Sequence, residues 1–130
     1  GLVECLVESR PMQVACRDSF LDNLHLLPAG GPAPQGGRLL RSSAMAAGLD
    51  TLRRLYDIVI LDIPAILSNS DSLLLTDLAD GVILVVRAGV TPAPLVNRAM
   101  EELDSGKFRG VVLNEAHSSI PRWLRRLLGL

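Results

Sequence analysis

Residues 57–64 are Asp57-Ile58-Val59-Ile60-Leu61-Asp62-Ile63-Pro64, an apolar run that ends in a carboxylate. A continuous run of β-branched residues and leucine, rather than an alternating one, is typical of a strand buried on both faces of a parallel sheet. Pro64 lacks the N–H that a sheet ladder needs, so we expect the strand to end near Asp62. The pattern predicts a buried strand over residues 58–61 that presents this carboxylate where open α/β sheets bind ligands.

An apolar strand followed by an aspartate is also the pattern of a Walker B element, in which the carboxylate helps to hold a magnesium ion beside a phosphate. The same pattern fits a core strand that simply ends in a turn or in a capping aspartate. The other patterns of the chain are therefore needed to decide between a ligand site at Asp62 and a plain strand end.

Composition and charge indicate one domain over residues 1–130 with an apolar core. The 130 residues are 48% hydrophobic and carry a formal net charge of -1, which argues against a disordered chain and gives no electrostatic case for nucleic acid. Cys5 and Cys16 lack metal-ligand spacing, so we expect reduced core thiols in a cytosolic protein. The chain does not begin with Met, and we expect it to be cut from something longer.

Strand and helix patterns alternate along the chain with short connections. We expect helices over residues 1–7, 39–56 with a break at Ser42 or Ser43, 91–103 and 122–128, and a short helix that is capped by residues 68–71 and ends at Leu78. We also expect edge strands over 11–16 and 23–28 and buried strands over 82–86 and 110–113. This alternation predicts parallel strands joined by right-handed crossovers in a three-layer α/β sandwich with a mostly parallel sheet. Asp62, Arg87 and Asn114 each end or follow an apolar strand, so we expect them at one edge of that sheet.

Several phrases of the sequence occur together in a characteristic order. They are residues 24–30, 38–42, 56–64, 70–72, 79–87, 91 and 109–114. In this order and spacing they resemble the bacterial tyrosine kinases of capsule and exopolysaccharide synthesis, which belong to the MinD/ParA-like deviant Walker ATPases. The resemblance implies a P-loop NTPase fold and the use of ATP and Mg²⁺. It also implies that residues 1–130 are the C-terminal portion of a P-loop NTPase-like kinase domain.

The resemblance also implies roles for four residues. Asp62 matches the catalytic Walker B carboxylate, which orders Mg²⁺ through a water molecule. Asn114 matches a residue that hydrogen-bonds adenine, a task that suits an amide because it both donates and accepts. Asp71 and Arg87 match an acidic residue after Walker B and a strand-end arginine, and both are candidates for nucleotide binding. The alternatives are a helix cap for Asp71 and a surface ion pair for Arg87.

The sequence also departs from the family pattern. The family has Asp-Thr-Pro-Pro after the strand, whereas residues 62–65 are Asp-Ile-Pro-Ala. The glycine-rich residues 30–37 lack the Gly-Lys-Ser/Thr of a phosphate loop, and neither Walker A nor Walker A′ is present. Tyr56 is the single tyrosine, so the tyrosine cluster that these kinases phosphorylate is missing. We therefore expect the fold to lack the phosphate-loop strand and this chain to be inactive by itself.

These patterns favour a nucleotide-binding domain that regulates exopolysaccharide or capsule synthesis from the cytoplasm, near the inner face of the membrane. Its expected partner is a membrane polysaccharide co-polymerase (a chain-length regulator) or a second copy, with no nucleic acid. Residues 120–128 form an Arg-rich segment with Trp123 that either meets an anionic membrane surface or packs on the sheet. One alternative is a non-catalytic pseudo-ATPase that docks on the regulator. The other is a receiver domain, although an early acidic pair and a lysine after the last strand are missing.

Overall fold

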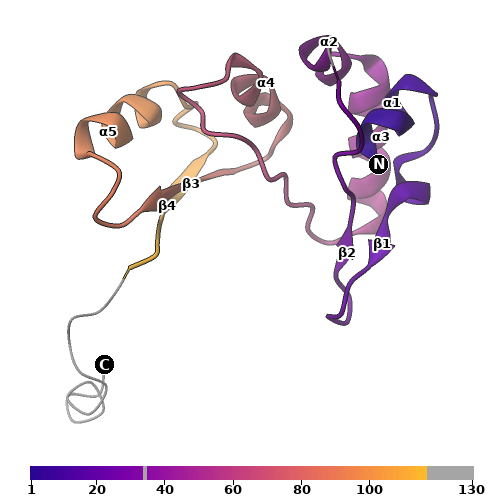
Figure 1. Ribbon diagram of the computed structural model, residues 1–130, viewed down its shortest axis with the longest axis horizontal. Coiled ribbons are helices and arrows are strands. Elements are labelled where there is room, and N and C mark those ends of the chain that lie inside the picture. The colour runs from indigo at the N-terminus through magenta and orange to yellow at the C-terminus, as the bar shows by residue number, and fades with distance from the viewer. Residues whose placement is uncertain (34, 117–130) are drawn as a thin grey trace. The chain divides into compact units, whose positions relative to one another are not determined.

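The computed structural model describes residues 1–33 and 35–116 (Figure 1). The chain divides into two compact units, one formed by Gly1–Ala79 and one that begins at Asp80. The first unit is mainly helical, and the second contains a parallel pair of strands with a crossover helix. Within the described ranges, no helix has the length and apolar character that a membrane span requires.

The first unit has short helices and one small hairpin. Its helices are α1 (Leu2–Val7), the 3-10 helix η1 (Met12–Ala15), α2 (Gly36–Leu40), α3 (Ser43–Leu55) and α4 (Ser70–Leu78). Strands β1 (Arg17–Asp18) and β2 (His25–Leu26) pair antiparallel.

The core of the first unit forms around α3. Met45, Leu49 and Leu52 follow one another at helical spacing and are all buried. They cluster with Cys5 and other buried residues of α1 and η1, as expected for an amphipathic helix whose apolar stripe faces a core. Both cysteines are free thiols, in agreement with the prediction that they are reduced.

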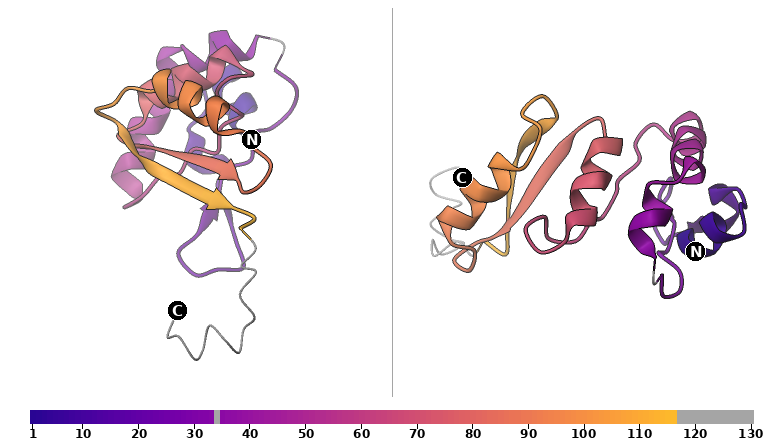
Figure 2. Two further views of the ribbon diagram at one scale, coloured as in Figure 1. Left: turned by 90° about the vertical axis from the view of Figure 1, so that its left-hand side faces the viewer. Right: turned by 90° about the horizontal axis from the view of Figure 1, so that it is seen from above.

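The second unit contains β3 (Val82–Arg87), α5 (Ala93–Glu101) and β4 (Phe108–Asn114). β3 and β4 pair in parallel, and α5, drawn in orange, runs alongside them (Figure 2). Val86, Ala99 and Leu103 are buried in this unit. The two apolar strands, their parallel pairing and the crossover helix between them were all predicted from the sequence and are confirmed.

The predicted strand over residues 58–61 is wrong for this structure. These residues are assigned to neither helix nor strand, and the two sheets of the described chain have two strands each, β1–β2 and β3–β4. Ile58 is 78% exposed and Ile60 is 84% exposed, so burial on both faces is also wrong. An apolar run favours the interior of a sheet, but a strand forms only when a neighbouring strand completes its hydrogen bonds.

Two other predictions are corrected. Residues 11–16 are not an edge strand, since η1 occupies most of this stretch and its Met12 is buried in the core. The strands β3 and β4 are not buried on both faces, since Ile83 and Val85 are 60% and 61% exposed. The predicted helix over residues 122–128 lies outside the described residues.

The predicted break in the helix over residues 39–56 is confirmed at Ser42, which separates α2 from α3. The Ser42 hydroxyl accepts a hydrogen bond from the Met45 backbone N–H at 3.2 Å and donates one to the Leu39 carbonyl at 2.6 Å. Ser42 is therefore the N-cap of α3, and it satisfies a backbone donor that the first helical turn leaves unpaired.

Replacing this cap tests its contribution to stability. Ser42→Ala is expected to lower the free energy of unfolding by about 0.5–2 kcal/mol, because the Met45 N–H loses its acceptor. Ser43→Ala is the matched control, since Ser43 is the first residue inside the helix, where alanine is favourable. Urea unfolding followed by circular dichroism measures both values, and equal stabilities would contradict the capping role.

Candidate functional site

Arg87 and Asn114 lie side by side at the carboxyl ends of β3 and β4. The parallel register pairs Val85 with Val112 and Arg87 with Asn114. The Ala88 N–H donates to the Asn114 carbonyl at 2.9 Å, so hydrogen bonding continues to the last residue of β4. The carboxyl edge of a parallel sheet is where open α/β folds bind ligands. The predicted shared edge is thus present for these two residues.

Glu115 orders both of these side chains. The Arg87 guanidinium contacts the Glu115 carboxylate at 3.1 Å through Nε and 3.0 Å through Nη2. The Asn114 side-chain oxygen accepts a hydrogen bond from the Glu115 N–H at 2.9 Å. This leaves the amide N–H groups of Asn114 as the donors that it presents outward, since the residue is exposed. Arg87 forms the surface ion pair that was its alternative interpretation.

Sequence reasoning did not identify Glu115. Its backbone has a positive φ of 57°, a conformation that a non-glycine residue adopts only uncommonly. The oppositely charged residues Arg87 and Glu115 are separated by 28 positions in the sequence. Only the parallel register brings them together, so no local pattern could have revealed the pair.

Asp62 belongs to the first unit, in the extended segment that precedes α4. Its side chain is exposed, and its neighbours Leu61 and Ile63 are half-buried. The backbone is held two residues later, where the Ser72 hydroxyl donates to the Pro64 carbonyl at 3.1 Å. The carboxylate thus faces solvent from an anchored segment rather than from the end of a paired strand.

Asp71 lies in the first turn of α4 and contacts α2. Asn69 is the N-cap of α4, and its side chain accepts from the Asp71 N–H at 2.9 Å. The Asp71 carboxylate lies 3.8 Å from the Arg41 guanidinium and directly over Gly37. A carboxylate in the first turn also interacts favourably with the helix dipole. Asp71 therefore connects α4 to α2, and its role toward a nucleotide stays a prediction.

A single carboxylate such as Asp62 suits a magnesium ion whose other ligands are waters and substrate phosphates. Among residues 1–33 and 35–116, no group of three or more His, Cys, Asp or Glu side chains is placed to hold a metal. Mg²⁺ in nucleotide sites is usually held by one or two carboxylates together with waters and substrate phosphates. One exposed carboxylate is consistent with that arrangement.

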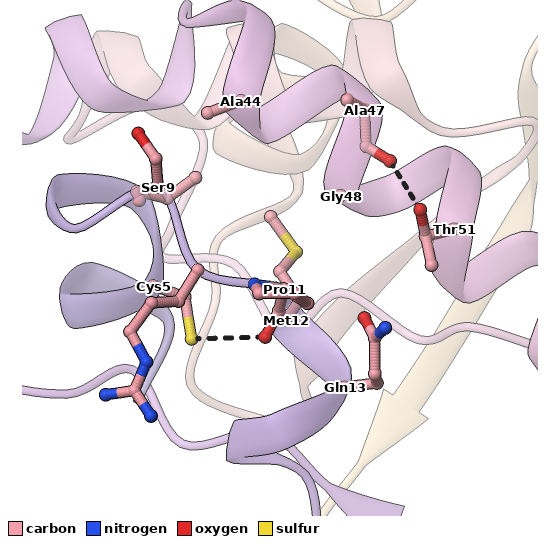
Figure 3. A pocket seen from close by; sticks show the side chains of 11 residues that line it. Cys5, Ser9, Pro11, Met12, Gln13, Ala44, Ala47, Gly48 and Thr51 are labelled. Carbon is pink, nitrogen blue, oxygen red and sulfur yellow. Dashed lines mark hydrogen bonds between the residues drawn. The ribbon is translucent and has the colours of Figure 1, made fainter.

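A separate pocket of about 410 Å³ lies in the first unit between α1, η1 and α3 (Figure 3). Its lining includes Cys5, Met12, Gly48 and Thr51. The Cys5 thiol donates to the Pro11 carbonyl at 3.8 Å, and the Thr51 hydroxyl donates to the Ala47 carbonyl at 3.0 Å. None of the predicted site residues lines this pocket.

Comparison with known proteins shows relatives of one kind, although no protein-family model matches the chain. It is 35% identical to the succinoglycan biosynthesis transport protein ExoP of Rhizobium meliloti, over 88% of this chain and 15% of ExoP. It is 30% identical to the tyrosine-protein kinase CpsD of Streptococcus pneumoniae, over 95% of this chain and 55% of CpsD. It is 32% identical to the tyrosine-protein kinase YwqD of Bacillus subtilis, over 88% of this chain and 49% of YwqD. The chain spans about half of these kinases and a smaller share of ExoP.

Solved structures agree with these relatives. The VpsO kinase domain aligns with a TM-score of 0.81 and 30% identity, over 90% of this chain and 59% of that domain. The chimerical protein CapA2B2 aligns with a TM-score of 0.83 and 28% identity, over 91% of this chain and 53% of the chimera. The predicted resemblance to the bacterial tyrosine kinases is thereby confirmed, and this chain is homologous to part of their kinase domain.

The contact between Asp71 and α2 can be tested at two adjacent glycines. A Cβ atom at Gly37 would lie 2.5 Å from an oxygen of the Asp71 carboxylate, whereas one at Gly36 would make an ordinary contact with Ala33 at 3.9 Å. Gly36→Ala is expected to raise the free energy of unfolding by about 0.4–1 kcal/mol, because alanine restricts the unfolded chain. Gly37→Ala should instead lower the free energy of unfolding, because the Asp71 carboxylate must move away from Arg41. Equal stabilisation by both variants in urea unfolding would contradict the contact.

Proposed function

We propose that this chain is part of an ATP-binding domain of the bacterial tyrosine-kinase type that regulates capsule or exopolysaccharide synthesis. The observation that carries the proposal is the parallel pair β3–β4, with Arg87 and Asn114 together at its carboxyl edge. The identities to CpsD and YwqD support the kinase type. The similarity to ExoP, a transport protein of succinoglycan biosynthesis, supports the part of the proposal that concerns exopolysaccharide synthesis.

Each candidate residue has a distinct role in this proposal. Asn114 donates its amide N–H to a ring nitrogen of adenine, because its oxygen already accepts from Glu115. Arg87 carries positive charge at the same edge and attracts the anionic nucleotide. Asp62 orders Mg²⁺ through a water molecule and so acts on the reaction centre, while Asp71 adds negative charge near the start of α4. When bound, Mg²⁺ neutralises the charge that develops on the transferred phosphate.

The alternating exposure of residues 58–61 supports a larger sheet, since Val59 and Leu61 pack against the core while the two isoleucines face solvent. Ile58 and Ile60 are exposed in an extended stretch that no described strand pairs. We infer that this stretch becomes a strand when a neighbouring strand is supplied, because pairing satisfies its backbone groups and burial removes its apolar side chains from water. The complete domain is then the three-layer sandwich of P-loop NTPases, and Asp62 lies at the end of a strand.

The phosphate loop has to come from polypeptide outside residues 1–130, since this sequence has no Gly-Lys-Ser/Thr. Without backbone N–H groups and a lysine around the phosphates, phosphoryl transfer lacks most of its positioning and charge stabilisation. The chain alone is therefore inactive in this proposal. The whole protein acts in the cytoplasm at the inner face of the membrane, with a membrane chain-length regulator or a second copy as its partner.

Nucleotide binding should depend on a supplied phosphate loop. Isothermal calorimetry is expected to find weak or undetectable binding of Mg²⁺–ATP to residues 1–130. A chimera that places before Gly1 the part of CpsD preceding its matched region is expected to bind, because the phosphates then have their cradle. Asp62→Asn in the chimera should weaken binding when Mg²⁺ is present and should have little effect when it is chelated. Tight Mg²⁺–ATP binding by residues 1–130 alone would contradict the proposal.

A second candidate function is a non-catalytic pseudo-ATPase that docks on the membrane regulator. Ile63, which replaces the threonine that follows the Walker B aspartate in the family pattern, favours this candidate because a polar group is lost beside the metal site. The chimera distinguishes the two functions. Binding of Mg²⁺–ATP without any ATP hydrolysis, even after Ile63→Thr, would support the docking role.

A further inference from the structure

We infer that Ser72 is a positioning residue for Asp62, because its hydroxyl anchors the backbone immediately after the carboxylate. The anchor is a feature of the first unit by itself. Its consequence for Mg²⁺ rests on the proposed function, so the experiment below separates the anchor from its consequence.

The two buried side chains of α4 are both polar, although Leu75 and Leu78 of the same helix also pack against the core. Ser72 is fully buried, at 0% exposure, and Thr76 is 8% exposed. The two residues are four positions apart and therefore share one face of the helix. Burial of a hydroxyl costs free energy unless it has a hydrogen-bond partner. The partners of these two hydroxyls therefore indicate the role of each residue.

The two hydroxyls have different partners. Thr76 donates to the Leu73 carbonyl of its own helix at 2.7 Å. Ser72 instead donates to the Pro64 carbonyl at 3.1 Å, across to the segment that carries Asp62. Thr76 satisfies itself within α4, whereas Ser72 links α4 to another part of the unit. This difference makes Thr76 a matched internal control.

Anchoring Pro64 restricts Asp62 because the backbone between the two residues has little conformational freedom. The proline ring fixes the φ angle of residue 64, and Ile63 between the two residues is half-buried. The segment has no sheet ladder to hold it. Leu61 packs against the core before Asp62, and the hydrogen bond from Ser72 fixes the backbone after it, so the two contacts together restrict where the carboxylate lies.

The anchor accounts for a departure in the sequence. The family pattern has a threonine directly after the Walker B aspartate, and this chain has Ile63 in that place. Here a hydroxyl reaches the same short segment from Ser72 on α4. Groups that orient a metal-binding carboxylate affect metal affinity without touching the metal, so Ser72 should influence Mg²⁺ through Asp62.

Ser72→Ala and Thr76→Ala test the inference by two readouts. In residues 1–130 labelled with ¹³C-proline, Ser72→Ala is expected to shift the carbonyl NMR signal of Pro64, and Thr76→Ala is expected to leave it in place. In the CpsD chimera, Ser72→Ala should raise the Mg²⁺ concentration at half-saturation of the ATP complex by roughly three- to tenfold, as for one lost hydrogen bond. ATP binding measured with Mg²⁺ chelated should be unchanged in both variants.

The outcomes distinguish the inference from the proposed function. An unshifted Pro64 signal in Ser72→Ala overturns the anchor, and equal Mg²⁺ effects of Ser72→Ala and Thr76→Ala overturn the positioning role. If the unmodified chimera does not bind Mg²⁺–ATP, the proposed function fails and the Mg²⁺ consequence with it, while the Pro64 signal still decides the anchor. If Ser72→Ala does not fold, Ser72→Cys replaces it, because a thiol fills the site but donates only weakly.

Discussion

The parallel ladder between β3 and β4 determines which chemical groups share an edge in the second unit. Its register pairs Arg87 with Asn114, and the pair then places Glu115 against the Arg87 guanidinium. Parallel strands need a crossover, which α5 supplies, and that crossover covers only one side of a two-stranded sheet. The exposed side chains of Ile83 and Val85 follow from this limit, since residues 80–116 supply no layer over the other face.

Local patterns predicted those elements that depend on local chemistry. The apolar runs at 82–86 and 110–113 gave β3 and β4, and the hydroxyl of Ser42 marked the boundary between α2 and α3. The run at 58–61 has the same composition but forms no strand, because pairing requires a neighbour that the described chain does not contain. Residues 11–16 failed for another reason, since burial of Met12 in the core outweighed a weak strand preference.

The candidate site shows the same division between local and distant information. Arg87 and Asn114 could be placed together from the sequence because both follow apolar runs in a βαβ pattern. Glu115, Arg41 and Ser72 could not, because their contacts join segments that are distant in sequence or depend on a backbone turn. The family resemblance is the source of the proposed roles of Asp62 and Asn114, whereas the structure shows the contacts of Glu115 with Asn114 and of Ser72 with the segment after Asp62.

The assignment of Asp62 and Asn114 to one nucleotide is tested most directly by paramagnetic NMR on the CpsD chimera with ATP, using Mn²⁺ in place of Mg²⁺. Mn²⁺ broadens signals of nuclei close to it. If both residues serve one bound nucleotide, the amide signal of Asp62 should lose most of its intensity and that of Asn114 a smaller part, only when Mn²⁺ and ATP are present together. An ATP-bound chimera in which the Asp62 signal keeps its full intensity would contradict the assignment.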